Sequence, residues 1–157
     1  PSVFSLTQAG TAILTRYNKL KEQEGYQILF EPAEECNVYA DEGRIGQVIY
    51  NLINNALTYT GPDKTVTVTQ TVEGDQGRIA VHDSGQGIPQ EELPLIWNRY
   101  YRSKENHKRA IQGSGLGLSI VRSILEAHHA PYGVESQAGT GTTFWFMLPR
   151  RNEEQEK

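Results

Sequence analysis

Three glycines at alternate positions, Gly113, Gly115 and Gly117, lead directly into a run of apolar residues with helical spacing. The first N–H groups of a helix have no internal partner and lie at the positive end of the helix dipole. Glycine also lets a ligand approach the backbone closely. The stretch therefore predicts a phosphate-binding turn, although glycines before a helix also serve plain packing.

Two asparagines, Asn51 and Asn55, lie four residues apart in a predicted helix over residues 42–58. The apolar residues of this helix recur at three- and four-residue spacing, so they form one buried face, and the two asparagines share another. Asparagine is a poor interior helix former, so an aligned pair beside Tyr59 needs a reason, an exposed polar face being the simple one. Amide oxygens suit Mg²⁺, which binds few protein ligands together with phosphate oxygens.

Asp83 is the last residue of a predicted strand over residues 78–83, and Gly85 and Gly87 follow it. The alternation of the strand turns Asp83 inward and His82 toward the surface. A carboxylate held at a strand end can accept a hydrogen bond from the exocyclic amine of a ligand. The simple alternative is an aspartate that only starts a turn.

The elements that must position these residues follow from periodicity and from turn residues. We predict helices over residues 1–24, 42–58, 90–102 and 116–129, and strands over residues 26–31, 37–39, 65–73, 78–83, 132–136 and 142–148. They make one domain over residues 1–149. The polar stretch at about residues 89–112 is predicted to be a lid. The charged tail over residues 150–157 is expected to fray.

Composition narrows the class of protein. The 157 residues are 37% hydrophobic and 22% charged with a net charge of −4, which is typical of a soluble globular domain with no general attraction to nucleic acid. The single cysteine, Cys36, is expected to be a packed residue in a reducing compartment. No apolar run reaches the length of a membrane span. Because the chain begins at Pro1, we expect it to be a fragment of a longer protein.

Taken in order, four motifs resemble the catalytic ATP-binding domain of bacterial sensor histidine kinases, over about residues 4–149. That domain belongs to the ATPase group shared with gyrase, the Hsp90 chaperones and MutL. The N box matches residues 41–56, the first glycine box residues 83–88, the F box residues 97–102, and the second glycine box residues 113–118.

The resemblance implies a Bergerat-type α/β two-layer sandwich, in which helices cover one face of a mixed, mostly antiparallel sheet. It implies ATP and Mg²⁺ between the helix 42–58 and the lid. By position, Asn55 would hold Mg²⁺ with Asn51 nearby, Asp83 would bind the adenine amino group, and Arg102 would reach the γ-phosphate. The remaining nucleotide-binding positions implied by the family are Tyr59, Gly85, Gly87, Ile88, Gly113, Gly115, Leu116, Gly117 and Leu118.

In this family the γ-phosphoryl group passes to a histidine on a separate dimerisation domain, and then to a response regulator. The resemblance thus implies a protein-histidine kinase whose acceptor domain is absent here, so we expect this chain alone not to phosphorylate itself. The parent protein is expected to be a homodimer anchored in the cell membrane, with this domain in the cytoplasm.

Three departures from the family pattern stand out. Thr58 occupies a place where lysine or arginine is usual, so we expect basic lid residues such as Arg102 and Lys104 to supply charge. Trp97 replaces the usual phenylalanine and should still pack. Pro131, after His129 and Ala130 in place of two glycines, should change a turn.

Other classes remain open. Gyrase- or MutL-type hydrolysis is disfavoured, because Asn51 stands where those relatives carry a glutamate as general base, and an amide cannot accept the proton. An anti-sigma-type serine kinase is disfavoured less strongly by the long lid and the F box. A degenerate nucleotide-binding module remains possible because of Thr58.

Overall fold

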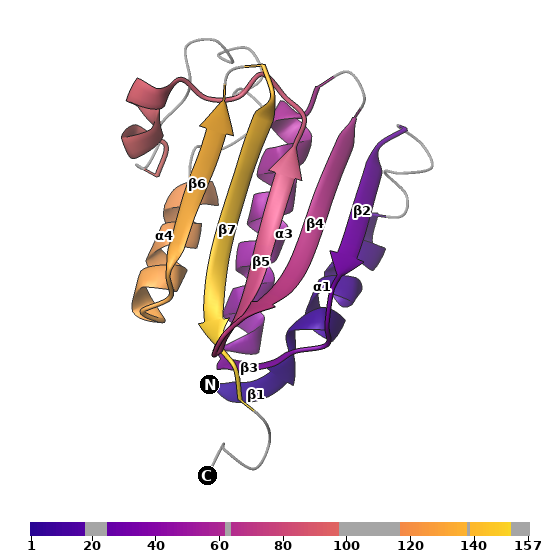
Figure 1. Ribbon diagram of the computed structural model, residues 1–157, viewed down its shortest axis with the longest axis vertical. Helices are drawn as coiled ribbons and strands as arrows, with labels where there is room; N and C mark the ends of the chain where they lie inside the picture. Colours follow the sequence, from indigo (N-terminus) through magenta and orange to yellow (C-terminus); the bar gives the residue numbers. More distant parts are fainter. Residues whose placement is uncertain (18–24, 62–63, 98–116, 138, 152–157) are drawn as a thin grey trace.

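The structure is a computed structural model that describes residues 1–17, 25–61, 64–97, 117–137 and 139–151. Helices cover one face of a five-stranded sheet with the order β2-β4-β5-β7-β6 (Figure 1). Only β2 and β4 are parallel neighbours, and the other pairs are antiparallel. This confirms the predicted two-layer α/β sandwich with a mixed, mostly antiparallel sheet. The strands are β2 (Gln27–Pro32), β4 (Thr65–Glu73), β5 (Gln76–Asp83), β6 (Tyr132–Gln137) and β7 (Gly141–Pro149).

The core lies between this sheet and three helices, α1 (Leu6–Leu14), α3 (Glu42–Tyr59) and α4 (Gly117–Ala127). The register brings Val68, Val81 and Phe144 into one row across β4, β5 and β7, and all three side chains are buried. The apolar stripe of α3 packs onto these rows, and Ile45 and Ile49 are fully buried. Alternation in the strands and helical periodicity in α3 therefore meet at one interface, as the sequence predicted.

The N-terminal segment differs from the predicted helix over residues 1–24. Residues 2–5 form a strand, β1 (Ser2–Ser5), that pairs with β3 (Asn37–Ala40) in a separate two-stranded sheet. The Ser5 hydroxyl accepts a hydrogen bond from the Gln8 N–H, so the helix begins at Leu6. The helix ends at Leu14 and a 3₁₀ turn, η1 (Thr15–Tyr17), follows. Residues 18–24 lie outside the described residues.

Three other boundaries differ from the prediction. β5 begins at Gln76, because the hairpin turn needs only Gly74 and Asp75, and Gly74 has a φ of +57°. The helix predicted over residues 90–102 is a short 3₁₀ helix, η2 (Gln90–Leu95), with Pro94 inside it. Its continuation beyond residue 97 lies outside the described residues. α4 ends at Ala127 rather than at residue 129, because His129 has a left-handed φ of +54°.

The beginning of the C-terminal tail is held in place, in contrast to the expected fraying from residue 150. The Arg150 N–H donates to the Asp75 carbonyl at 2.8 Å, and the Arg151 N–H donates to the Asn37 carbonyl at 2.9 Å. The Arg151 guanidinium also lies over the Tyr39 ring, 4.9 Å from its centroid. Residues 152–157 lie outside the described part of the chain.

Candidate nucleotide-binding site

The site is positioned by two antiparallel helices, α3 and α4. His128, just after α4, reaches the beginning of α3, where its Nε2 accepts the Asp41 N–H at 3.1 Å. Because Nε2 accepts, Nδ1 carries the proton and donates to the Ile124 carbonyl at 2.8 Å. The C-terminal end of α4 is thereby tied to the N-terminal end of α3. The start of α4 must therefore lie toward the other end of α3.

Helix geometry shows how far along α3 the start of α4 falls. Gly117 lies eleven residues before His128, which is about 16 Å at the rise of an α-helix. The same rise counted from Asp41 reaches Leu52 on α3, next to Asn51. Gly117, at the end of the predicted phosphate turn, and Asn51, one of the predicted Mg²⁺ ligands, thus lie at about the same level along the helix pair.

Asn51 and Asn55 are both half-buried. Asn54, between them, has a different environment, because its amide oxygen accepts the Tyr17 hydroxyl at 2.9 Å. Burial, and secondly the neighbouring Tyr50, raise the pKa of Tyr17 well above its ordinary value, so this hydroxyl remains a donor. Asn54 therefore faces the α1 side of α3. Asn51 and Asn55 fall on the opposite flank of the buried face, toward α4.

Asp83 ends β5 with its side chain only 2% exposed, as the alternation predicted. Its Oδ1 accepts the Gly85 N–H at 2.9 Å, which fixes the carboxylate against the following turn. Across the sheet Asp83 pairs with Thr142 of β7, which is also buried. Gly141 has a φ of +111°, and a Cβ there would run into the Asp83 carbonyl oxygen. The backbone around Asp83 is therefore closely packed on both sides.

The end of α3 meets the end of β5. The Thr60 hydroxyl, just after α3, lies 3.2 Å from the Ser84 hydroxyl, just after Asp83. A Cβ at Gly61 would lie 2.6 Å from the Ser84 carbonyl oxygen, so only glycine allows this approach. Figure 1 shows the tip of β5 and the last turn of α3 at the same end of the molecule, and the start of α4 is the end of that helix nearer to them. The N box, the first glycine box and the end of the second glycine box thus converge.

Part of the predicted site can be placed. Gly87 has a φ of +84°, Ile88 packs against the core, Gly117 begins α4, and Leu118 packs against the core behind it. Other predicted positions lie outside the described residues, namely the side chain of Tyr59 together with Arg102, Gly113, Gly115, Leu116 and the lid from residue 98 onward.

The structure shows the contacts of two residues that depart from the family pattern, Thr58 and Trp97. The Thr58 hydroxyl donates to the Asn54 carbonyl at 2.9 Å, so this side chain satisfies its own helix and brings no charge. Trp97 packs edge-on against Phe144 and Tyr132, with ring centroids 5.4 and 5.1 Å apart, as expected for a bulky F-box residue.

Sequence analysis does not single out Gly141 and Thr142, because the glycines at 139 and 141 are typical of a simple turn between the predicted strands 132–136 and 142–148. A signal was present, since strand alternation places Thr142 inward among Phe144, Phe146 and Leu148, where an apolar residue is usual. A buried threonine hydroxyl at a strand end needs a polar partner, so a polar group is expected next to it. Only the strand pairing shows that Asp83 lies beside it.

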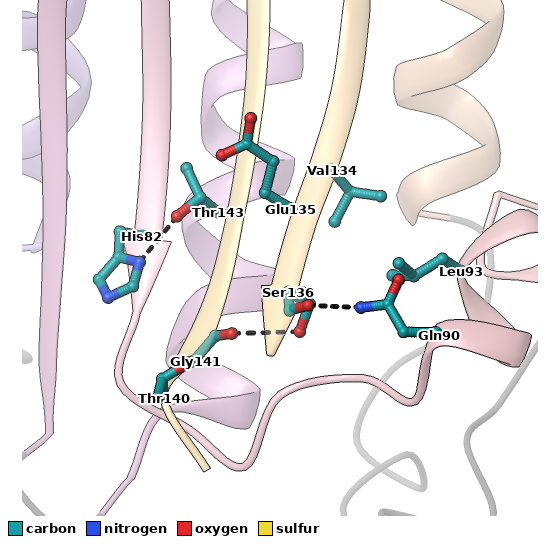
Figure 2. A pocket seen from close by; sticks show the side chains of 9 residues that line it. All are labelled: His82, Gln90, Leu93, Val134, Glu135, Ser136, Thr140, Gly141 and Thr143. Atoms are coloured by element: carbon teal, nitrogen blue, oxygen red, sulfur yellow. Dashed lines mark hydrogen bonds between the residues drawn. The ribbon is translucent and has the colours of Figure 1, made fainter. Parts of the chain in front are cut away.

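A cavity of about 480 Å³ lies beside this region (Figure 2). His82, Glu135 and Thr143 line it from the face of the sheet that α1, α3 and α4 do not cover, and His82 is exposed as predicted. Ser136 and Gln90 line it at the edge of the sheet, where the Gln90 amide donates to the Ser136 carbonyl at 2.7 Å. Asn51, Asn55 and Asp83 do not line this cavity, so it is distinct from the site above.

Comparison with known proteins gives the family. The model of the histidine kinase-, DNA gyrase B-, and HSP90-like ATPase family matches residues 40–152. The chain belongs to this family. It is 34% identical to the sensor histidine kinase WalK of Bacillus subtilis over 146 residues, which are 92% of this chain and 24% of WalK. It is 35% identical to the sensor histidine kinase CusS of Escherichia coli O157:H7 over 135 residues, which are 86% of this chain and 28% of CusS.

Solved structures agree with this assignment. A nucleotide-free catalytic domain of the histidine kinase ThkA superimposes with a TM-score of 0.83 at 30% identity, covering 95% of each chain. ThkA in complex with the response regulator protein TrrA matches with a TM-score of 0.79 at 27% identity, over 96% of this chain and 42% of that one. This chain is thus an ATPase domain of the histidine kinase type, and it spans about a quarter of the length of WalK and of CusS. Among the described residues, no helix is long and apolar enough to cross a membrane.

Proposed function

We propose that this chain binds Mg·ATP and donates the γ-phosphoryl group to a histidine on a separate dimerisation domain of the same sensor kinase, for relay to a response regulator. The observation that carries the proposal is the convergence of Asp83, the Asn51/Asn55 flank of α3 and the start of α4 at one end of the fold. Complementary support comes from the relatives, which are named sensor histidine kinases.

The roles follow from the chemistry of each group. The Asp83 carboxylate, oriented by the Gly85 N–H, accepts the adenine amino group. The N–H groups at the start of α4, at the positive end of the helix dipole, bind phosphate oxygens. Asn55 and Asn51 fit Mg²⁺, because half-buried amide oxygens are hard oxygen ligands and leave room for phosphate and water. Bound Mg²⁺ would neutralise phosphate charge.

Transfer to a histidine requires little covalent work from this chain. Catalysis of this kind depends on holding the phosphoryl group in line with its acceptor and on neutralising its charge. Because Thr58 brings no cation to α3, Arg102 and the basic residues that follow it are the proposed source of positive charge at the γ-phosphate. The chain supplies no acceptor histidine in this proposal, so the phosphate must leave it. The parent protein is proposed to be a membrane-anchored homodimer.

The first test is calorimetric titration of this chain with a non-hydrolysable ATP analogue, with and without Mg²⁺. In Asp83→Asn an oxygen can still accept the Gly85 N–H, but an NH₂ group replaces an acceptor of the adenine amine, so affinity should fall roughly 100-fold. The matched control is Asp75→Asn, at an exposed aspartate in the β4–β5 turn, which should bind like the unmodified chain. Binding that Mg²⁺ strengthens and that Asp83→Asn weakens to this extent supports the site.

The second test adds the histidine-containing domain of the parent protein together with Mg·ATP. Acid-labile phosphate should appear on that domain and not on this chain. Phosphate on this chain alone would contradict the proposal, and acid-stable phosphoserine on a partner would favour the serine-kinase reading. Analogue binding without transfer would favour a degenerate nucleotide-binding module, for which Thr58→Lys is the first variant to examine.

A further inference from the structure

The turn that follows Asp83 is held largely by a distant hairpin. Residues 84–89 belong to no helix or strand, and they carry both glycines of the first glycine box. Apart from the Gly85 bond to Asp83, one backbone–backbone bond and one backbone–side-chain bond tie this turn to the β6–β7 hairpin. The Gly139 N–H donates to the Gln86 carbonyl at 2.7 Å, and the Ile88 N–H donates to Ser136 Oγ at 2.7 Å. The β6–β7 hairpin therefore helps to fix the conformation of the turn.

Ser136 makes hydrogen bonds that connect the turn and the following Gln90 to this hairpin (Figure 2). Its hydroxyl accepts the Ile88 N–H and lies 3.1 Å from the Gly141 carbonyl and 2.9 Å from the Thr142 hydroxyl. A hydroxyl has one hydrogen and two lone pairs. The arrangement that satisfies all three neighbours has Ser136 donating to Gly141 and accepting from Ile88 and Thr142. The hydroxyl thus uses its full bonding capacity in a site where Ser136 is only 8% exposed.

The same residue is bound through its backbone. The Gln90 side chain donates to the Ser136 carbonyl at 2.7 Å, so β6 holds the turn at Ile88 and again at Gln90. On the neighbouring strand, Thr142 pairs with Asp83 and Gly141 packs against the Asp83 carbonyl. Ser136 therefore bonds to both of the segments next to the Asp83 carboxylate. These are Gly141 and Thr142 at the start of β7, and the turn that follows Asp83.

We infer that Ser136 is a positioning residue for adenine recognition, which sets the orientation of Asp83 by anchoring the Gly85–Ile88 turn to the β6–β7 hairpin. The inference rests on the proposed function, since it concerns the base specificity of the same nucleotide site. Without the hydroxyl, the half-buried Ile88 N–H loses its acceptor and the turn moves relative to the sheet. The Gly85 N–H then no longer fixes the carboxylate, and selectivity for a base with an exocyclic amine falls.

The test compares non-hydrolysable analogues of ATP and of ITP, whose base carries a carbonyl in place of the amino group. In Ser136→Ala the affinity for the ATP analogue should fall roughly tenfold, with much less loss for the ITP analogue, so that the ratio of the two collapses. A loss of stability alone would lower both affinities together and leave the ratio unchanged. The matched control is Thr143→Ala on β7, whose hydroxyl bonds to His82 on the uncovered face of the sheet. It should keep the ratio.

Ser136→Cys nearly keeps the size of the side chain and replaces a strong hydrogen-bond acceptor by a weak one. It is the variant to use if Ser136→Ala does not fold. An intermediate ratio is expected for the cysteine variant. A folded Ser136→Ala or Ser136→Cys protein with the unmodified ratio would overturn the inference. Asp83→Asn separates the two proposals. If Asp83→Asn leaves the ratio of the two affinities unchanged, the proposed adenine role of Asp83 is wrong. If Asp83→Asn changes the ratio and the Ser136 variants do not, only the proposed role of Ser136 is refuted.

Discussion

The two ends of the α3–α4 helix pair are held in different ways. At one end, Asp41 caps α3 by accepting the Arg44 N–H at 3.2 Å, and His128 joins the two helices through both ring nitrogens. α4 ends there in a turn in which the Ala130 N–H donates to the Leu125 carbonyl at 2.9 Å. We call this the locked end. Its polar groups bind one another.

At the other end, which we call the ligand end, close packing of glycine backbones adds to the side-chain bonds of Ser136 and Thr60. Gly61 and Gly141 bring backbone segments into contact around Asp83, and Gly117 starts α4 without a side chain. Asn51 and Asn55 stay half-buried on their flank of α3. A nucleotide site must keep polar groups accessible, so part of its rigidity has to come from close backbone packing. Substitutions at the locked end should therefore change stability alone, and those at the ligand end should change binding, with a loss of stability where the backbone packing is broken.

The largest effect is expected for Gly141→Ala, which attacks the backbone packing of the ligand end. The new Cβ would collide with the Asp83 carbonyl, and alanine is strained at a φ of +111°. We expect the free energy of unfolding to fall by about 3 kcal/mol or more, with loss of nucleotide binding. Urea denaturation followed by circular dichroism measures the first quantity, and calorimetry the second.

Gly139→Ala is the matched control, because Gly139 also has a positive φ, +84°, but a Cβ there would meet nothing within 4 Å. It should show only the conformational cost, about 1–2 kcal/mol. Equal losses in the two variants would mean that the close approach to Asp83 has no energetic weight.

His128→Ala should damage the locked end. It leaves the Asp41 N–H without its acceptor and removes the side-chain bond to the Ile124 carbonyl, which keeps the backbone N–H of residue 128, so we expect a loss of about 2 kcal/mol in the free energy of unfolding. The affinity for an ATP analogue should change by less than about threefold, because the ligand end has its own contacts. His129→Ala, at an exposed neighbour, controls for loss of an imidazole. A fall in affinity clearly larger than threefold would show that the two ends of the helix pair are coupled.

The sequence predicted those parts of the fold whose signal is periodic. The apolar stripe of α3 and the alternation of β4 and β5 placed the core, and with it Asp83 inward and the asparagines on a separate flank. Contacts between distant segments left no such signal. The helical spacing of Leu6, Ala9 and Ile13 was extended back to residue 1, although residues 2–5 pair with Asn37–Ala40. A strand that short depends on its partner, which the local sequence does not contain.

The same limit explains what was missed in the site. Ser136 and Gly141 act on the glycine box through a strand register that joins residues about 50 positions apart along the chain. The tie between His128 and Asp41 spans 87 positions. Motifs identified the residues expected to contact the ligand, because each motif is local. The residues that hold those motifs in place become visible only in the structure.

The two adjacent asparagines of α3 sharpen the comparison within one helix. Asn54→Ala removes the acceptor of the Tyr17 hydroxyl and should lower the free energy of unfolding by about 1 kcal/mol, while Mg²⁺ still strengthens nucleotide binding. Asn55→Ala should leave stability unchanged or raise it by a few tenths of a kcal/mol, since alanine is the better helix former, and should abolish the Mg²⁺ effect. Denaturation and calorimetry on both variants check this crossed pattern. Loss of the Mg²⁺ effect in Asn54→Ala would show that the assignment of the two flanks is wrong.

A small gain in stability is expected at His129, where the turn after α4 needs a left-handed residue. His129 has a φ of +54°, a conformation that costs a side-chain-bearing residue about 1 kcal/mol and glycine almost nothing. His129→Gly should therefore raise the free energy of unfolding by roughly 0.5 kcal/mol, after allowing for the greater freedom of glycine in the unfolded chain. Ala127→Gly, inside the last turn of α4, should lower it instead. Nucleotide affinity should be the same in both variants, because the locked end can be strengthened or weakened while the backbone packing around Asp83 stays intact.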